Sequence, residues 1–135
     1  MGKYLLFIDD DKTFLYLIER VCQKIETVSK LATAKNGSEA IEKINGWLES
    51  KEVLPDVIFI DINMPVMGGF EFLAELKEIK YKTQELDEVL PVVMLTSSYH
   101  NQDKEKAFAT GIVGDYIIKP ASITELEQEI RRAIE

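Results

Sequence analysis

The chain has 135 residues, 46% of them hydrophobic and 30% charged, which are the length and composition of one globular domain. Its net charge of −8 argues against direct binding to nucleic acid or to anionic membranes, because both need a basic face. The sequence has one cysteine, no signal-peptide layout and no apolar run long enough to cross a membrane. We therefore expect a cytoplasmic protein with a single domain over residues 1–135 and no output domain.

Five short apolar runs alternate with stretches of helical periodicity, and this alternation is typical of βαβ units in a parallel sheet. The third and fourth runs are apolar at every position, as expected of central strands that helices cover on both faces. The sequence predicts strands at Tyr4–Ile8, Val28–Ala32, Val57–Ile60, Val92–Leu95 and Val113–Ile118.

Capping residues and glycines predict where the five helices begin and end. The fourth helix, from Gln102 to Thr110, has few apolar residues and is expected to end at Gly111. The polar stretch Tyr81–Leu90 is expected to be a loop remote from the carboxyl ends of the strands. Cys22 falls on the apolar face of the first helix and is expected to be a buried thiol. The other helices are predicted to start after Asp11, at Asn36 with Glu39, after Gly68-Gly69 and at Ser122 with Glu125.

Polar residues follow four of the predicted strands. They are Asp9-Asp10 after the first strand, Asp61 after the third, Thr96 after the fourth and Lys119-Pro120 after the fifth. A parallel sheet places the carboxyl ends of all its strands at one edge, where open α/β folds bind ligands. We therefore expect three carboxylates, one hydroxyl and one lysine to form a single site.

Each of these residues alone has an ordinary structural interpretation, because an acid can cap a helix and a hydroxyl can stabilise a loop. Together they indicate phosphoryl chemistry. The Asp61 carboxylate can act as a nucleophile, a divalent cation held by carboxylates can neutralise phosphate charge, and Lys119 can bind phosphate oxygens. The bond between Lys119 and Pro120 is also a candidate for a cis peptide.

Four segments have an order and spacing that are highly specific: LLFIDD, IFIDINMPVMGG, VVMLTSS and DYIIKP. Through them the chain resembles, from end to end, the receiver domains of two-component response regulators. The resemblance implies a three-layer α/β/α sandwich with a flavodoxin-like (βα)5 fold, whose five-stranded parallel sheet has the order 2-1-3-4-5. The chain departs from the family at Gly68, where Asp is frequent, and we expect local loop flexibility there. The stretch Tyr81–Leu90 is longer than in compact members.

The resemblance implies a role for each residue of the expected site. Asp61 would accept the phosphoryl group, and Mg²⁺ would be bound by Asp10, by Asp61 and by the backbone carbonyl of Asn63. Asp9 would act partly through a metal-bound water. Lys119 would pair with Asp61 and then with the phosphoryl group.

A conformational switch is also implied by the resemblance. Thr96 would move toward the phosphoryl group, and Tyr116 would rotate inward behind it. The fourth helix, fifth strand and fifth helix would form the output face. The phosphodonor would be a sensor histidine kinase or a histidine phosphotransfer protein, and output would pass through a downstream protein partner, self-association or competition for phosphate. Such a domain is a signalling module and not an enzyme, since it catalyses only its own phosphorylation and dephosphorylation.

Three other classes of function fit the sequence less well. A phosphatase of the haloacid dehalogenase type uses a strand-end Asp and Mg²⁺, but it requires an acid two residues later, where this chain has Asn63. A flavin-binding electron carrier needs a hydroxyl- and glycine-rich loop after the first strand, where Asp9-Asp10-Asp11 would repel phosphate. An atypical receiver that works without phosphorylation is poorly supported, because every expected site residue is present.

Overall fold

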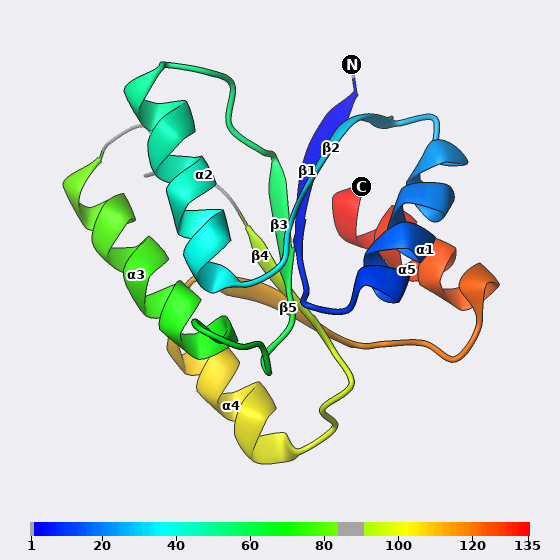
Figure 1. Cartoon of the computed structure of the whole chain (residues 1–135). Helices are drawn as coiled ribbons and strands as arrows, with labels where there is room; N and C mark the ends of the chain where they lie inside the picture. The colour runs from blue at the N-terminus through cyan, green and yellow to red at the C-terminus, as the bar shows by residue number, and fades with distance from the viewer. Residues whose placement is uncertain (1, 84–90) are drawn as a thin grey trace.

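The computed structural model describes residues 2–83 and 91–135, and these residues form a central sheet between two layers of helices (Figure 1). Within them the sheet has five strands in the order β2-β1-β3-β4-β5, and neighbouring strands are parallel. The strands are β1 (Lys3–Ile8), β2 (Val28–Ala34), β3 (Val57–Ile60), β4 (Val92–Thr96) and β5 (Val113–Ile118). The predicted fold class and strand order are confirmed.

Helices cover both faces of this sheet. They are α1 (Lys12–Gln23), α2 (Gly37–Glu49), α3 (Gly69–Lys82), α4 (Asn101–Ala109) and α5 (Ile123–Ile134). Figure 1 shows α1 and α5 on one side of the sheet and α2, α3 and α4 on the other. The alternating connections therefore build a three-layer α/β/α sandwich.

The two faces of β1 supply two separate hydrophobic cores, because successive side chains of a strand point to opposite sides. Leu6 and Ile8 pack in the core that includes α2 and α3, whereas Leu5 and Phe7 pack with α1 and α5. Phe7 also stacks on Phe59 of β3, with ring centroids 4.4 Å apart. Full burial of each such side chain contributes about 1.5–3 kcal/mol. The central strands are therefore a rigid base for the residues that follow them.

The predicted capping residues stand where the helices begin. Asn36 accepts a hydrogen bond from the Glu39 N–H, and Ser122 accepts one from the Glu125 N–H. The Glu39 carboxylate accepts from the N–H of Lys35 and not from that of Asn36, so the return half of the capping box is displaced by one residue. These caps confirm the predicted starts of α2 and α5.

Two expectations about loops need correction. α3 continues to Lys82, so Tyr81 and Lys82 belong to a helix and not to a loop, whereas residues 84–90 lie outside the described residues. The helix extends because no Gly or Pro interrupts it and its last turn is basic, which suits the negative end of the helix dipole. The described residues contain no cis peptide bond, so the cis expectation for Lys119–Pro120 is wrong. Trans remains the preferred form even before proline.

None of the helices within residues 2–83 and 91–135 combines the length and the apolar character needed to cross a membrane.

Candidate functional site

The register of the sheet places Asp9 and Asp61 side by side. Ile8 of β1 pairs with Ile60 of β3, and an aspartate follows each of them. The N–H of Asp61 donates to the carbonyl of Ile8 at 3.1 Å, which continues the ladder to the ends of both strands. Both aspartates are buried, with 3% of Asp9 and 7% of Asp61 exposed. The fold thus holds two carboxylates beside each other at the sheet edge.

A third carboxylate completes an acidic cluster. One oxygen from each of Asp9, Asp10 and Asp61 lies within 4.8 Å of the others. Asp10 is exposed, unlike its two partners. Hard divalent cations such as Mg²⁺ take oxygen ligands and keep several waters, so three carboxylates with one side open to solvent fit such an ion. The cluster therefore has the donor set of a divalent metal site.

Asp11 caps α1 and is not part of the carboxylate cluster. Its carboxylate accepts from the N–H of Thr13 at 3.0 Å and from that of Phe14 at 3.2 Å. Its own N–H donates to the Asp9 carboxylate at 2.9 Å, which fixes one oxygen of Asp9. The structural interpretation of the acidic run as a helix cap thus applies to Asp11. Asp10 does not cap the helix, and its carboxylate is available to bind a metal ion.

The ammonium of Lys119, the residue after β5, contacts two of the three carboxylates. Its Nζ lies 2.8 Å from Asp9 Oδ2 and 3.2 Å from Asp61 Oδ2. Burial raises the pKa of Asp9, an effect that the hydrogen bond from Lys119 partly offsets. Burial alone would lower the pKa of Lys119, but the Asp9 hydrogen bond and the charges of Asp61 and Asp9 outweigh it and raise that pKa. Lys119 is therefore a fixed positive charge between two carboxylates.

The loop between β3 and α3 is held by a hydrogen bond within it and by one to the start of α2. The N–H of Ile62 donates to Asp61 Oδ1 at 2.7 Å, and the N–H of Gly37 donates to the carbonyl of Met67 at 2.9 Å. A Cβ on Gly37 would lie 2.8 Å from the Met67 side chain, so only glycine allows this approach. The sequence did not lead us to predict a role for Gly37. The feature that could have indicated one is the presence of glycine, a poor helix former, in the first turn of α2.

The same loop contains a strained residue. Val66 has φ +69°, and the Met67 N–H donates to the Pro65 carbonyl at 2.8 Å across it. This pairing is that of a γ-turn, in which a positive φ is unfavourable for a β-branched residue. Asn63, in the first part of the loop, is exposed, and the ligand role of its carbonyl stays a prediction.

Thr96 and Tyr116 meet through the loop after β4 and not at the carboxylates. Thr96 is fully buried, and its hydroxyl oxygen accepts from the Ser98 N–H at 3.2 Å. The Tyr116 hydroxyl donates to the Ser98 carbonyl at 3.0 Å. Burial raises the pKa of Tyr116, and the charge of Asp61 adds to that shift. The structure thus connects both expected switch residues through Ser98.

Comparison with known proteins identifies the family. The profile of the response regulator receiver domain matches residues 5–131, which is nearly the whole chain. The chain belongs to the response regulator receiver family. Receivers of two-component systems accept a phosphoryl group on an aspartate and change conformation, and the acidic cluster is consistent with that chemistry. Membership favours this interpretation over the phosphatase and the flavin carrier.

Individual relatives agree with the family assignment. The receiver is 34% identical over 130 residues to the heme response regulator HssR of Staphylococcus epidermidis, covering 96% of this chain and 50% of HssR. It therefore spans about half the length of that relative. The phosphorylated cyanobacterial phytochrome response regulator RcpA has 26% identity and a TM-score of 0.82, with 98% and 91% of the two chains covered. The Mn²⁺-bound response regulator Rcp1 has 26% identity and a TM-score of 0.76, with 97% and 91% covered.

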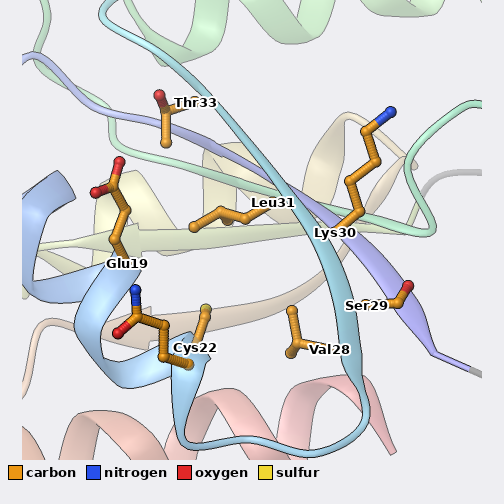
Figure 2. Close-up of a pocket in the computed structure, with 8 residues that line it drawn as sticks. Glu19, Cys22, Val28, Ser29, Lys30, Leu31 and Thr33 are labelled. Carbon is orange, nitrogen blue, oxygen red and sulfur yellow. The ribbon is translucent and has the colours of Figure 1, made fainter.

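The receiver also has a surface groove of about 330 Å³ between α1 and β2 (Figure 2). Apolar side chains of Cys22, Val28 and Leu31 line it together with the side chain of Glu19, whereas the Lys30 side chain points away from α1 and places its ammonium 4.6 Å from the centroid of the Tyr4 ring. It contains none of the clustered carboxylates. Cys22 is 5% exposed, which confirms the expected buried thiol.

Proposed function

We propose that this receiver accepts a phosphoryl group on Asp61 from a phosphohistidine of a sensor kinase or phosphotransfer protein. The observation that carries the proposal is the position of Asp61 within a cluster of two further carboxylates and one ammonium. Lys119 contacts it directly, and Asp9 and Asp10 complete the oxygen cluster. The family assignment supplies the reaction class.

Asp9, Asp10 and Asp61 are the side chains that would hold Mg²⁺, Asp9 partly through water, with the backbone carbonyl of Asn63 as a further ligand. The donor set supports this, because three carboxylates face one ammonium and leave a negative excess. The bound ion would neutralise charge on the oxygens of the transferred phosphoryl group. The resemblance to Mn²⁺-bound Rcp1 agrees with a divalent ion at such a site.

In the proposed transfer, a carboxylate oxygen of Asp61 attacks phosphorus as the bond from phosphorus to the donor histidine nitrogen breaks. The other ring nitrogen of the donor carries a proton, so the products are an acyl phosphate on Asp61 and a neutral imidazole, in which the departing nitrogen keeps the electron pair of the broken bond. Lys119 pairs with the carboxylate before transfer and with a phosphoryl oxygen afterwards, so no buried charge is left unpaired. The Ile62 N–H holds Oδ1 of Asp61 and orients the carboxylate.

The proposed output is a change on the face formed by α4, β5 and α5. Thr96 and Tyr116 already contact Ser98, which lies in the loop that leads to α4. We infer that the output passes through a protein partner or self-association. We also infer a cytoplasmic location, since histidine kinases are phosphorylated from ATP in that compartment.

The test is uptake of one phosphoryl group from a small phosphodonor, measured by intact mass with and without Mg²⁺. Wild-type protein is expected to form a Mg²⁺-dependent adduct, and Asp61→Asn is expected to form none while keeping its circular dichroism spectrum. Equal uptake by Asp61→Asn would show that another residue is the acceptor.

A further inference from the structure

α4 has one buried residue, a cation–π contact of Lys106 with the Phe70 ring at 4.3 Å, and polar contacts at its two ends. Ala107 is the one residue of the described helix that is buried. At the C-terminal end, the Lys77 ammonium donates to the Thr110 carbonyl at 2.9 Å. At the N-terminal end, the Ser98 hydroxyl donates to the Asp103 carboxylate at 2.5 Å. Because one alanine buries little apolar area, these contacts have a large share in fixing the position of the helix.

Ser98 uses each of its polar groups to contact a different element. Its N–H donates to the Thr96 hydroxyl at the end of β4, and its carbonyl accepts from Tyr116 of β5. Its hydroxyl donates to Asp103, the third residue of α4. A displacement of the Thr96 hydroxyl therefore removes the acceptor of the Ser98 N–H and disturbs the two other contacts of the same residue.

We propose that the Ser98–Asp103 hydrogen bond is a latch that holds α4 in its resting position and opens when Thr96 turns toward an occupied Asp61. This inference rests on the proposed function, because it assumes that a ligand on Asp61 attracts the Thr96 hydroxyl. A hydrogen bond to a charged carboxylate is among the stronger polar contacts of a protein. Its loss would free the first turn of a helix that has little apolar packing.

The surroundings of Tyr116 support the same connection. Burial raises the pKa of Tyr116, and the charges of Asp103 and Asp61 act in the same direction, against the hydrogen bond to Ser98. Asp103 is therefore close enough to Tyr116 to affect its ionisation. When the latch opens, the Asp103 carboxylate loses a donor, and Ser98, whose carbonyl accepts from Tyr116, is no longer held to α4. Asp103 and Tyr116 can then change position together.

Thermodynamic linkage gives the latch a measurable consequence. A ligand that favours the released state must supply the free energy that opens the latch. A variant without the latch already populates that state, so the ligand binds it more tightly by the same factor. Loss of the latch should therefore loosen α4 and raise the affinity for a phosphoryl analogue together.

The experiment measures amide hydrogen exchange of residues 101–109 in the full chain, first without any ligand. Ser98→Ala and Asp103→Ala each remove one side of the latch, and Glu105→Ala removes a neighbouring charge of α4 as the matched control. Both latch variants are expected to exchange about tenfold faster than wild type, as loss of one charged hydrogen bond implies. The double variant should be no faster than either single one, because both delete the same interaction.

The second part adds Mg²⁺ and beryllofluoride, an analogue of the phosphoryl group. Amide exchange in wild-type α4 is expected to speed up toward the rate of the latch variants. In those variants exchange should change little, and they should bind beryllofluoride about tenfold more tightly. Unchanged exchange in the ligand-free latch variants would refute the latch and leave the proposed function intact. Faster exchange in those variants, with wild-type α4 unaffected by bound beryllofluoride, would refute the switching role.

Failure of the proposed function has a different signature. If wild-type protein and Asp61→Asn respond identically to beryllofluoride and Mg²⁺, Asp61 is not the ligand site. The coupling of the latch to Asp61 would then also be wrong, whereas the ligand-free exchange rates would still report whether Ser98 and Asp103 hold α4.

Discussion

Lys119 is the residue on which the two buried aspartates depend. Its ammonium lies 2.8 Å from Asp9 and 3.2 Å from Asp61, and both carboxylates are almost fully buried. Buried charges are tolerated when they are paired and hydrogen-bonded, so removal of the ammonium leaves an unfavourable pair of like charges. Mg²⁺ could still offset that pair, but a phosphoryl group would lose its direct cationic partner.

We predict that Lys119→Ala binds Mg²⁺ at least as tightly as wild type, because a competing cation is gone. Phosphoryl uptake should slow by roughly 10²-fold, the order of effect seen when one preorganised electrostatic contact is removed. The response of α4 to beryllofluoride should be lost. A Mg²⁺ titration, uptake kinetics and hydrogen exchange measure these effects, with Lys43→Ala as the control, and uptake at the wild-type rate would contradict the role of Lys119.

Cys22 gives a prediction about pH. Burial raises the pKa of its thiol from the ordinary value of 9.0 to about 12, so the folded chain keeps the proton while the unfolded chain ionises earlier. This contribution to stability is complete below the unfolded pKa and is lost as pH rises from about 9 toward 12. At about pH 8, a thiol reagent should label native protein at least ~10²-fold more slowly than urea-unfolded protein, because the thiolate is the reactive form. Equal labelling rates would show that the thiol is accessible.

At the scale of elements, glycines decide how closely α3 approaches the end of β3. A Cβ on Gly69 would lie 2.4 Å from the carbonyl oxygen of Asp61, whereas nothing lies within 4 Å of a Cβ on Gly46 of α2. Gly68 has φ −79°, which any residue adopts, so the expected flexibility at this departure from the family is not required by the backbone. Of the two adjacent glycines, Gly69 is therefore the one that the close packing requires.

We predict opposite effects for two glycine-to-alanine changes. Gly69→Ala should lower the free energy of unfolding by about 2 kcal/mol, because the backbone of Asp61 must shift to admit the methyl group. Gly46→Ala should raise it by about 1 kcal/mol through helix propensity. Urea denaturation measures both, and a stabilising Gly69→Ala would mean that the loop is less closely packed than the structure shows.

The sequence predicts features that depend on neighbouring residues better than contacts between residues that are far apart in the chain. Strand apolarity and caps such as Asn36 and Ser122 are local signals, and they place the starts of these elements, whereas the ends of β2 and α3 differ from the expectation. The meeting of Asp9, Asp61 and Lys119 also follows, since parallel topology collects strand ends at one edge. The contact of Gly37 with Met67 joins the start of α2 to the loop between β3 and α3, and no local pattern predicts it. The hydrogen bond of Ser98 to Asp103 depends on side-chain directions that only the structure gives.

At the scale of the whole molecule, charge links stability to metal binding. The chain carries a net charge of −8, and three of its acids form the cluster. Repulsion among these acids opposes folding, and a divalent cation that binds only the folded chain stabilises it by mass action. The unfolded chain has no such arrangement of oxygens.

We predict that Mg²⁺ at about 100 times its dissociation constant adds about 2.7 kcal/mol to the free energy of unfolding. Asp10→Asn should be more stable than wild type without Mg²⁺, because a like charge is removed, and should gain much less from the ion. Glu49→Gln, outside the cluster, is the control for net charge. Thermal unfolding over a Mg²⁺ series measures this, and an equal gain in Asp10→Asn would place the ion elsewhere.

The central claim, that Asp61 is the phosphoryl acceptor of a metal-assisted cluster, is tested most directly by mapping the modified residue. Wild-type protein is treated with a small phosphodonor and Mg²⁺, the acyl phosphate is reduced with borohydride, and peptides are sequenced by mass spectrometry. The account predicts conversion of Asp61 alone, and none when the ion is chelated. Modification of Asp9 or Asp10 in its place, or of Asp61 without any metal, would contradict it.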